Sequence, residues 1–121
     1  MKARVPYPFN VTEQDAIRFA GVCGYRFTND TKYVIAFYND KRHDWLYFNR
    51  KAEGTNFVIA LKGRPLPSSF AHAEIVSNSN FRKLPKGPTS RSKVNHQGHQ
   101  FCLPHASHLP DLLRQLNGTV P

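Results

Sequence analysis

The sequence predicts a single α+β domain, in which one antiparallel sheet of about five strands packs against an N-terminal and a C-terminal helix. Three observations predict it. The chain has 121 residues, so a single domain is expected to span residues 1–121. A capped, amphipathic helix pattern lies near each end of the chain. Short β-branched and aromatic runs, separated by polar turns, fill the region between the two helices.

The first helix is expected at residues 13–23. Thr12 is a suitable N-cap, and Asp15 three residues later gives a variant of the capping box. Gly24 stands where a glycine commonly ends a helix. The face expected to pack on the sheet consists of Ala16, Phe19, Ala20 and Cys23.

Four strands are expected in the middle of the chain, because runs of β-branched and aromatic residues alternate with turn-forming residues. These runs lie at residues 25–28, 33–38, 45–49 and 56–61. The short turns between them favour an antiparallel meander. Polar and apolar residues do not alternate cleanly, so at least one strand is expected to be covered on both faces. The residues interpreted as core rather than as a binding face are Tyr33, Phe37, Trp45, Tyr47 and Phe57.

The second half of the chain is less regular. Residues 70–76 fit either a short helix or a strand. Residues 77–98 contain few apolar groups and are expected to form a long, mobile, basic loop. A short strand at 100–103 leads to a last helix, with Ser107 as its N-cap and Gly118 at its end. The apolar stripe of this helix consists of Leu109, Leu112, Leu113 and Leu116.

In residues 45–59, Trp-Leu-Tyr-Phe-Asn-Arg-Lys-Ala-Glu-Gly-Thr-Asn-Phe-Val-Ile, an aromatic run ends in Asn-Arg and is followed by a turn and an apolar run. This segment resembles a hairpin of the YgaC-like bacterial proteins, in which an aromatic strand ends in Asn-Arg, turns and returns as an apolar strand. Residues 101–105 and 112–118 resemble the family's final strand, Pro-His corner and last helix. YgaC-like proteins are similar in fold to the N-terminal domain of the TfoX competence regulator. The resemblance therefore implies an antiparallel sheet with helices on one side, and it brings no established catalytic residue or biochemical function.

The charge of the chain favours an anionic partner. Seventeen Lys and Arg face eight Asp and Glu, which gives a formal net charge of +9, and residues 75–110 contain no acidic residue. Cations on a loop suit the phosphates of DNA or RNA, and an aromatic ring among them could stack on an unpaired base. An acidic protein partner and a merely solvated loop are the alternatives. The predicted nucleic-acid-binding residues are Lys62, Arg64, Phe81, Arg82, Lys83, Lys86, Arg91 and Lys93.

A second pattern concerns possible metal ligands near the C-terminus. His96, His99, Cys102, His105 and His108 recur at every third residue. Imidazole and thiolate are preferred zinc ligands, but a period of three on a strand does not place these side chains on one face. We therefore expect no metal site. The two cysteines of the chain, Cys23 and Cys102, are interpreted as buried free thiols.

The chain is expected to be a binding protein rather than an enzyme, with no cofactor. It contains no Gly-x-Ser-x-Gly elbow, phosphate-binding glycine loop or nuclease carboxylate pattern. The alternative is a metal-free ribonuclease in which His99 or His105 acts with Lys93 by general acid–base chemistry. No apolar run reaches the roughly 20 residues that span a membrane, and the N-terminus lacks the apolar region of a signal peptide. We expect a cytoplasmic protein of bacterial or phage type, with no membrane partner.

Overall fold

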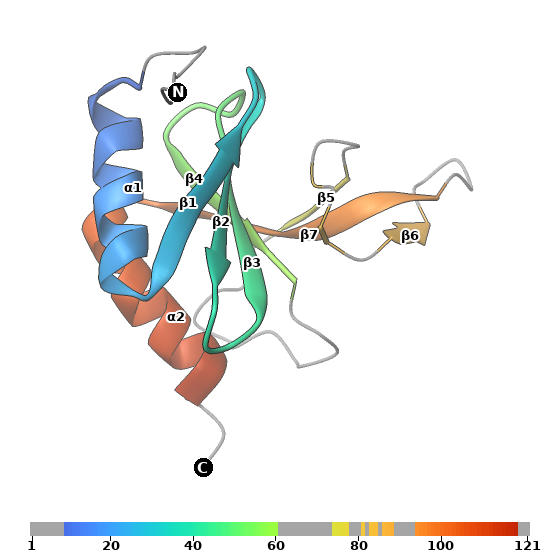
Figure 1. Ribbon diagram of the computed structural model, residues 1–121. Coiled ribbons are helices and arrows are strands. Elements are labelled where there is room, and N and C mark those ends of the chain that lie inside the picture. The colour runs from blue at the N-terminus through green and yellow to red at the C-terminus, as the bar shows by residue number, and fades with distance from the viewer. Residues whose placement is uncertain are drawn as a thin grey trace, which may run out of the picture.

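Two helices pack on one face of an antiparallel sheet (Figure 1). The computed structural model describes residues 9–60, 74–77, 81, 83–84, 86–88 and 94–118. The helices are α1 (Val11–Val22) and α2 (Leu109–Gly118), the second preceded by the 3-10 turn η2 (Ala106–His108). The strands are β1 (Tyr25–Asp30), β2 (Val34–Asn39), β3 (Asp44–Asn49), β4 (Thr55–Ile59), β5 (Glu74–Ser77), β6 (Lys86–Pro88) and β7 (Val94–Leu103). The predicted α+β architecture with two terminal helices is therefore confirmed.

The strands follow the order β1-β2-β3-β4-β7-β5, and β6 pairs with β7 outside this path. Every pairing is antiparallel. The five strands expected from the sequence correspond to β1, β2, β3, β4 and β7, so β5 and β6 are additions. Figure 1 shows β7 extending from β6, past β5, to the side of the sheet where the helices lie, so it is the strand that pairs with β4, β5 and β6.

The predicted loop at residues 77–98 is wrong where β6 forms and where β7 begins. Residues 94–99 are mostly polar, with Asn95, His96 and Gln97 in succession, so nothing in their composition marks a strand. Pairing with β4, β5 and β6 supplies the strand conformation instead, because tertiary context overrides β-propensity. Residues 74–77, whose sequence fits a helix or a strand, form a strand, and residues 70–73 lie outside the described part of the chain.

Both helix starts differ from the expected caps. Asn10, rather than Thr12, caps α1: its side chain accepts from the backbone N–H of Glu13 at 2.8 Å, and the Glu13 carboxylate accepts from the Asn10 N–H at 3.0 Å. This reciprocal pair is a full capping box. His105, rather than Ser107, caps the turn before α2 by accepting from the Ser107 N–H. Gly24 follows α1 with φ +90°, as expected for a glycine that ends a helix.

The helix-side core forms where the apolar faces of α1 and α2 meet alternate residues of the strands. Ala16 and Ala20 are fully buried, and Phe19 and Cys23 are partly buried beside them. The predicted leucine stripe of α2 is buried throughout. The strand residues of this core are Tyr25, Ile35, Phe37, Leu46, Phe48, Phe57, Ile59, Phe101 and Leu103.

The opposite face of the sheet is covered as well. Side chains alternate between the two faces of a strand, so the neighbours of the helix-side residues point away from the helices. A second buried cluster lies there, and β2, β3 and β4 are covered on both faces as expected. Its members are Val34, Ala36, Tyr47, Val58, Phe81 and Leu84. Among the predicted core aromatics, Phe37, Tyr47 and Phe57 are buried, whereas Trp45 is only partly buried against the second cluster and Tyr33, just before β2, is 38% exposed. None of the described helices is long and apolar enough to cross a membrane.

Candidate nucleic-acid interface

Phe81 is part of the core and not a free stacking surface. Only 2% of the residue is exposed, and its ring meets that of Tyr47 edge to face, with 5.5 Å between centroids. The prediction that Phe81 stacks on a base is therefore wrong, because burial of an aromatic ring holds it in the second cluster. Phe81 and Leu84 both pack in the second cluster, and the Leu84 N–H donates to the Phe81 carbonyl at 3.0 Å. These two residues hold the backbone near Lys83 against the sheet.

Lys83 lies between these two anchors and is exposed. Its backbone N–H donates to the Tyr47 hydroxyl at 3.0 Å, and its ammonium nitrogen lies 5.5 Å from the centroid of the Trp45 ring. The structure therefore presents Lys83 on the face of the sheet opposite the helices. Of the other predicted binding residues, Lys86 lies in β6 opposite His96. Those outside the described residues are Lys62, Arg64, Arg82, Arg91 and Lys93.

The strand register aligns Arg26, Tyr38 and Trp45, and the contact of Lys83 with the Trp45 ring adds a second cation at the end of this row. Arg26 of β1 is the partner of Tyr38 in β2, and Tyr38 is the partner of Trp45 in β3. The Arg26 guanidinium lies 5.7 Å from the Tyr38 ring centroid, and the two rings are 4.7 Å apart with a tilt of 48°. We name Arg26, Tyr38, Trp45 and Lys83 the aromatic–cation row. Both rings are partly buried, so each keeps an accessible portion.

Two further contacts fix the end of the sheet that carries the row. Arg26 binds the Asp40 carboxylate through two nitrogens, at 2.7 and 3.2 Å. This pairing holds the pKa of the Asp40 carboxyl below its usual range and raises that of the Arg26 guanidinium. The Tyr38 hydroxyl lies 3.1 Å from Nδ1 of His43, whose φ of 57° places it in the left-handed region that turns use. The cation–π contacts are weaker, about 0.5–1 kcal/mol each at exposed sites, so Lys83 can leave its ring at low cost.

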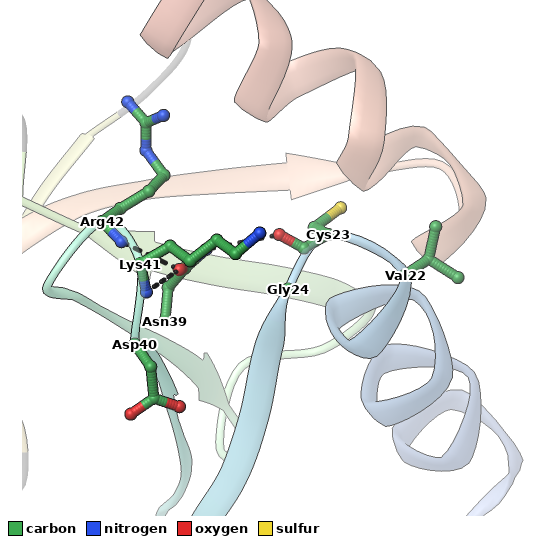
Figure 2. A pocket seen from close by; sticks show the side chains of 7 residues that line it. All are labelled: Val22, Cys23, Gly24, Asn39, Asp40, Lys41 and Arg42. Atoms are coloured by element: carbon green, nitrogen blue, oxygen red, sulfur yellow. Dashed lines mark hydrogen bonds between the residues drawn. The ribbon is translucent and has the colours of Figure 1, made fainter.

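A hollow of about 700 Å³ lies between the end of α1 and the turn that joins β2 to β3 (Figure 2). Asp40, the partner of Arg26, is one of the residues that line it. Asn39 lines the hollow, and its side-chain oxygen accepts from the backbone N–H groups of Lys41 and Arg42, at 2.9 and 3.0 Å. These donors are therefore engaged and cannot receive an anion. Burial raises the pKa of the Cys23 thiol, so it stays protonated near neutral pH and is a poor nucleophile. Figure 2 shows the Arg42 side chain pointing away from Asp40, and its guanidinium lies 3.8 Å from the Asp44 carboxylate instead.

Most carboxylates of the chain are already paired with cations outside residues 62–93. The buried Arg50, 8% exposed at its side chain, binds both Glu13 and Asp30 at 3.1 and 3.0 Å. It also donates to the Thr31 carbonyl at 2.9 Å, so this turn cation holds the fold together and is not a surface contact. Other ion pairs among the described residues are Asp15 with Arg18 and His105, Asp40 with Arg26, Asp44 with Arg42 and Asp111 with Arg114. Six of the eight acidic residues are thus engaged by cations outside the basic segment.

The histidines are not gathered into one site. His99 lies in β7, where burial lowers its pKa and keeps it neutral at neutral pH. His105 lies beyond the end of β7, with Nε2 3.1 Å from Asp15 and Nδ1 3.0 Å from the Ser107 hydroxyl. Since four strand residues span about 13 Å, the structure does not bring His99 and His105 together as a ribonuclease pair. Lys93 lies outside the described residues.

The remaining candidate metal ligands serve other contacts. The Nδ1 of His96 lies 2.8 Å from the Leu84 carbonyl oxygen. Among the described residues, no three His, Cys, Asp or Glu side chains lie close enough to hold a metal ion. Cys102 is exposed, so the interpretation of both thiols as buried is wrong for it. The physical reason is that Cys102 points away from the helix-side core, which its neighbours Phe101 and Leu103 enter.

No protein-family model, curated protein or solved structure matches this chain in our comparisons. The resemblance to YgaC-like proteins therefore stays a prediction. The candidate interface is therefore supported only by the contacts within this chain and by no relative.

The aromatic–cation row was missed by sequence reasoning, although the sequence holds a signal for it. The sequence predicts a polar turn at residues 39–44, and the residues that flank a hairpin turn directly face each other across the two strands. Counting outward from the turn pairs Tyr38 with Trp45, as the register shows. The sequence could not show that both rings lie on the face opposite the helices, because the side of the sheet that the helices cover depends on the tertiary fold.

Proposed function

We propose that this protein binds nucleic acid through a cationic surface made by the aromatic–cation row and the basic segment at residues 62–93. The observation that carries the proposal is the pairing of six of the eight carboxylates with cations elsewhere. The basic segment itself holds seven Lys and Arg and one acidic residue, Glu74, so it carries most of the net charge of +9. A cationic surface of this kind binds phosphates by releasing their counterions.

The exposed position of Lys83 supports the same proposal. Its neighbours Phe81 and Leu84 are 2% and 4% exposed, so the backbone that carries Lys83 is fixed to the sheet. A fixed backbone lowers the entropy lost when the side chain engages a phosphate. Among the predicted binding residues whose side chains the structure describes, Phe81 is buried and Lys83 is exposed.

The direct test measures binding to short labelled DNA and RNA by fluorescence anisotropy, with protein freed of co-purified nucleic acid. We expect binding at low salt that weakens steeply as salt rises. Undetectable binding to both DNA and RNA at low salt contradicts the proposal. Polyglutamate of similar length serves as the competitor: if it binds as tightly as nucleic acid at equal salt, an acidic protein is the better partner.

A further inference from the structure

We infer that the aromatic–cation row is a stacking platform for unpaired bases, so that the ligand is single-stranded nucleic acid rather than a duplex. This inference rests on the proposed function and specifies its substrate. Tyr38 and Trp45 lie side by side on neighbouring strands, 4.7 Å between ring centroids, on the face of the sheet opposite the helices, and both rings are partly exposed. Aromatic rings on a sheet can stack on bases only where the bases are unpaired.

The cations of the row are placed to hold the backbone of a strand whose bases lie on the rings. Lys83 stands over Trp45 at one end, and Arg26 stands over Tyr38 at the other. Arg26 is held by the two hydrogen bonds to Asp40, whereas no described carboxylate pairs with Lys83. Lys83 is therefore the cation free to move from its ring to a phosphate, since a charge-assisted bond to phosphate is stronger than an exposed cation–π contact.

The row differs from another exposed ring that lysines flank. Tyr33 lies at the opposite end of β2, with Lys32 and Lys51 at 5.6 and 5.4 Å from its ring centroid. It carries the same kinds of residue but offers a single ring. Adjacent rings support consecutive bases, which a lone ring cannot do. Tyr33 therefore supplies a matched control for the row.

Trp45 provides a direct readout, because it is the sole tryptophan of the chain. We expect its fluorescence to be quenched when oligothymidylate is titrated in, and to change little with a duplex of matched length. Affinity for the single strand should exceed that for the duplex at equal salt. Equal affinities with unchanged Trp45 fluorescence overturn the inference and leave the proposed function standing. Absence of binding to either ligand overturns the proposed function itself.

Variants of Tyr38 separate stacking from structural support. Tyr38→Leu should weaken binding to the single strand about tenfold, the loss of one stacked base, and leave duplex binding unchanged. Tyr38→Phe removes the contact with His43 but keeps the ring, so binding should stay near wild type. Tyr33→Leu should have no effect. If Tyr38→Phe weakens binding as much as Tyr38→Leu, or if Tyr33→Leu does so, the rings of the row are not the platform.

Discussion

Gly98 lies where the second buried cluster comes closest to the backbone of β7. A Cβ added there would stand 2.7 Å from Cδ1 of Leu84 and 2.9 Å from Cγ1 of Val58. We expect Gly98→Ala to lower the free energy of unfolding by about 1–3 kcal/mol, the usual cost of overpacking a core. Urea unfolding measures the change.

The control for this variant is Gly21→Ala in α1, where an added Cβ would meet nothing within 4 Å. Alanine is the better helix former, so this variant should be unchanged or more stable by up to about 1 kcal/mol. Equal effects of the two substitutions would show that close packing at Gly98 is not the cause.

The two cysteines differ in their surroundings and should differ in reactivity. Burial raises the pKa of the Cys23 thiol, while Cys102 is exposed on β7. Thiolate is the reactive form, so iodoacetamide at mildly alkaline pH should modify Cys102 first. Mass spectrometry of peptides taken over time follows both sites. Faster modification of Cys23 would contradict the burial that the structure gives it.

His99 links stability to pH. Burial lowers its pKa in the folded protein, so the unfolded chain takes up a proton at higher pH than the folded one does. Its contribution to stability is therefore complete above the unfolded pKa, about 6.5, and is lost as pH falls through the folded value. We expect wild-type protein to lose more stability than His99→Gln between neutral and mildly acidic pH. Urea midpoints at the two pH values give the comparison, and equal losses would exclude His99 as the titrating group.

At the scale of elements, Arg50 joins three parts of the fold. From the turn after β3 it reaches Glu13 in α1 and Asp30 at the end of β1. We expect Arg50→Met to destabilise the protein by about 3–5 kcal/mol, because it leaves two buried carboxylates without a counter-charge. Thermal or urea unfolding measures the loss.

The matched control is Arg114→Met, which breaks an exposed pair with Asp111 within α2. Exposed pairs contribute at most about 1 kcal/mol, so this variant should be close to wild type. A similarly small loss for Arg50→Met would mean that the ion pairs of Arg50 with Glu13 and Asp30 do not stabilise the junction of α1, β1 and β3.

The elements that local patterns specify were predictable. The leucine stripe of α2 and the runs that became β2, β3 and β4 follow their expected periods and compositions. The extension of β7 over residues 94–99 was not predictable, since its polar residues become a strand only through their partners. Arg50 likewise resembles an ordinary turn residue until the fold brings Glu13 and Asp30 to it.

At the scale of the whole molecule, the sequence predicted the charge asymmetry but not its distribution in space. The net charge of +9 and the acid-free stretch at residues 75–110 are visible in the sequence. Which carboxylates are already engaged depends on contacts between distant segments, such as Arg26 with Asp40 or Arg50 with Glu13. The aromatic–cation row could not be predicted for the same reason, because the contact of Lys83 with Trp45 depends on the packing of Phe81 and Leu84 in the second cluster.

The salt dependence of binding tests the central claim most directly. We would measure the dissociation constant for a single strand across a range of salt concentrations. The proteins compared are wild type, an Arg82→Gln, Lys83→Gln, Lys86→Gln triple variant and a Lys32→Gln, Lys51→Gln, Arg114→Gln triple variant. Both variants carry the same reduction in charge, but only the first is altered at the proposed interface. We expect the magnitude of the slope of log affinity against log salt to fall by about 2 in the first variant, about 0.7 for each phosphate that is no longer neutralised. The slope should stay unchanged in the second variant. Equal slopes in the two variants would contradict it.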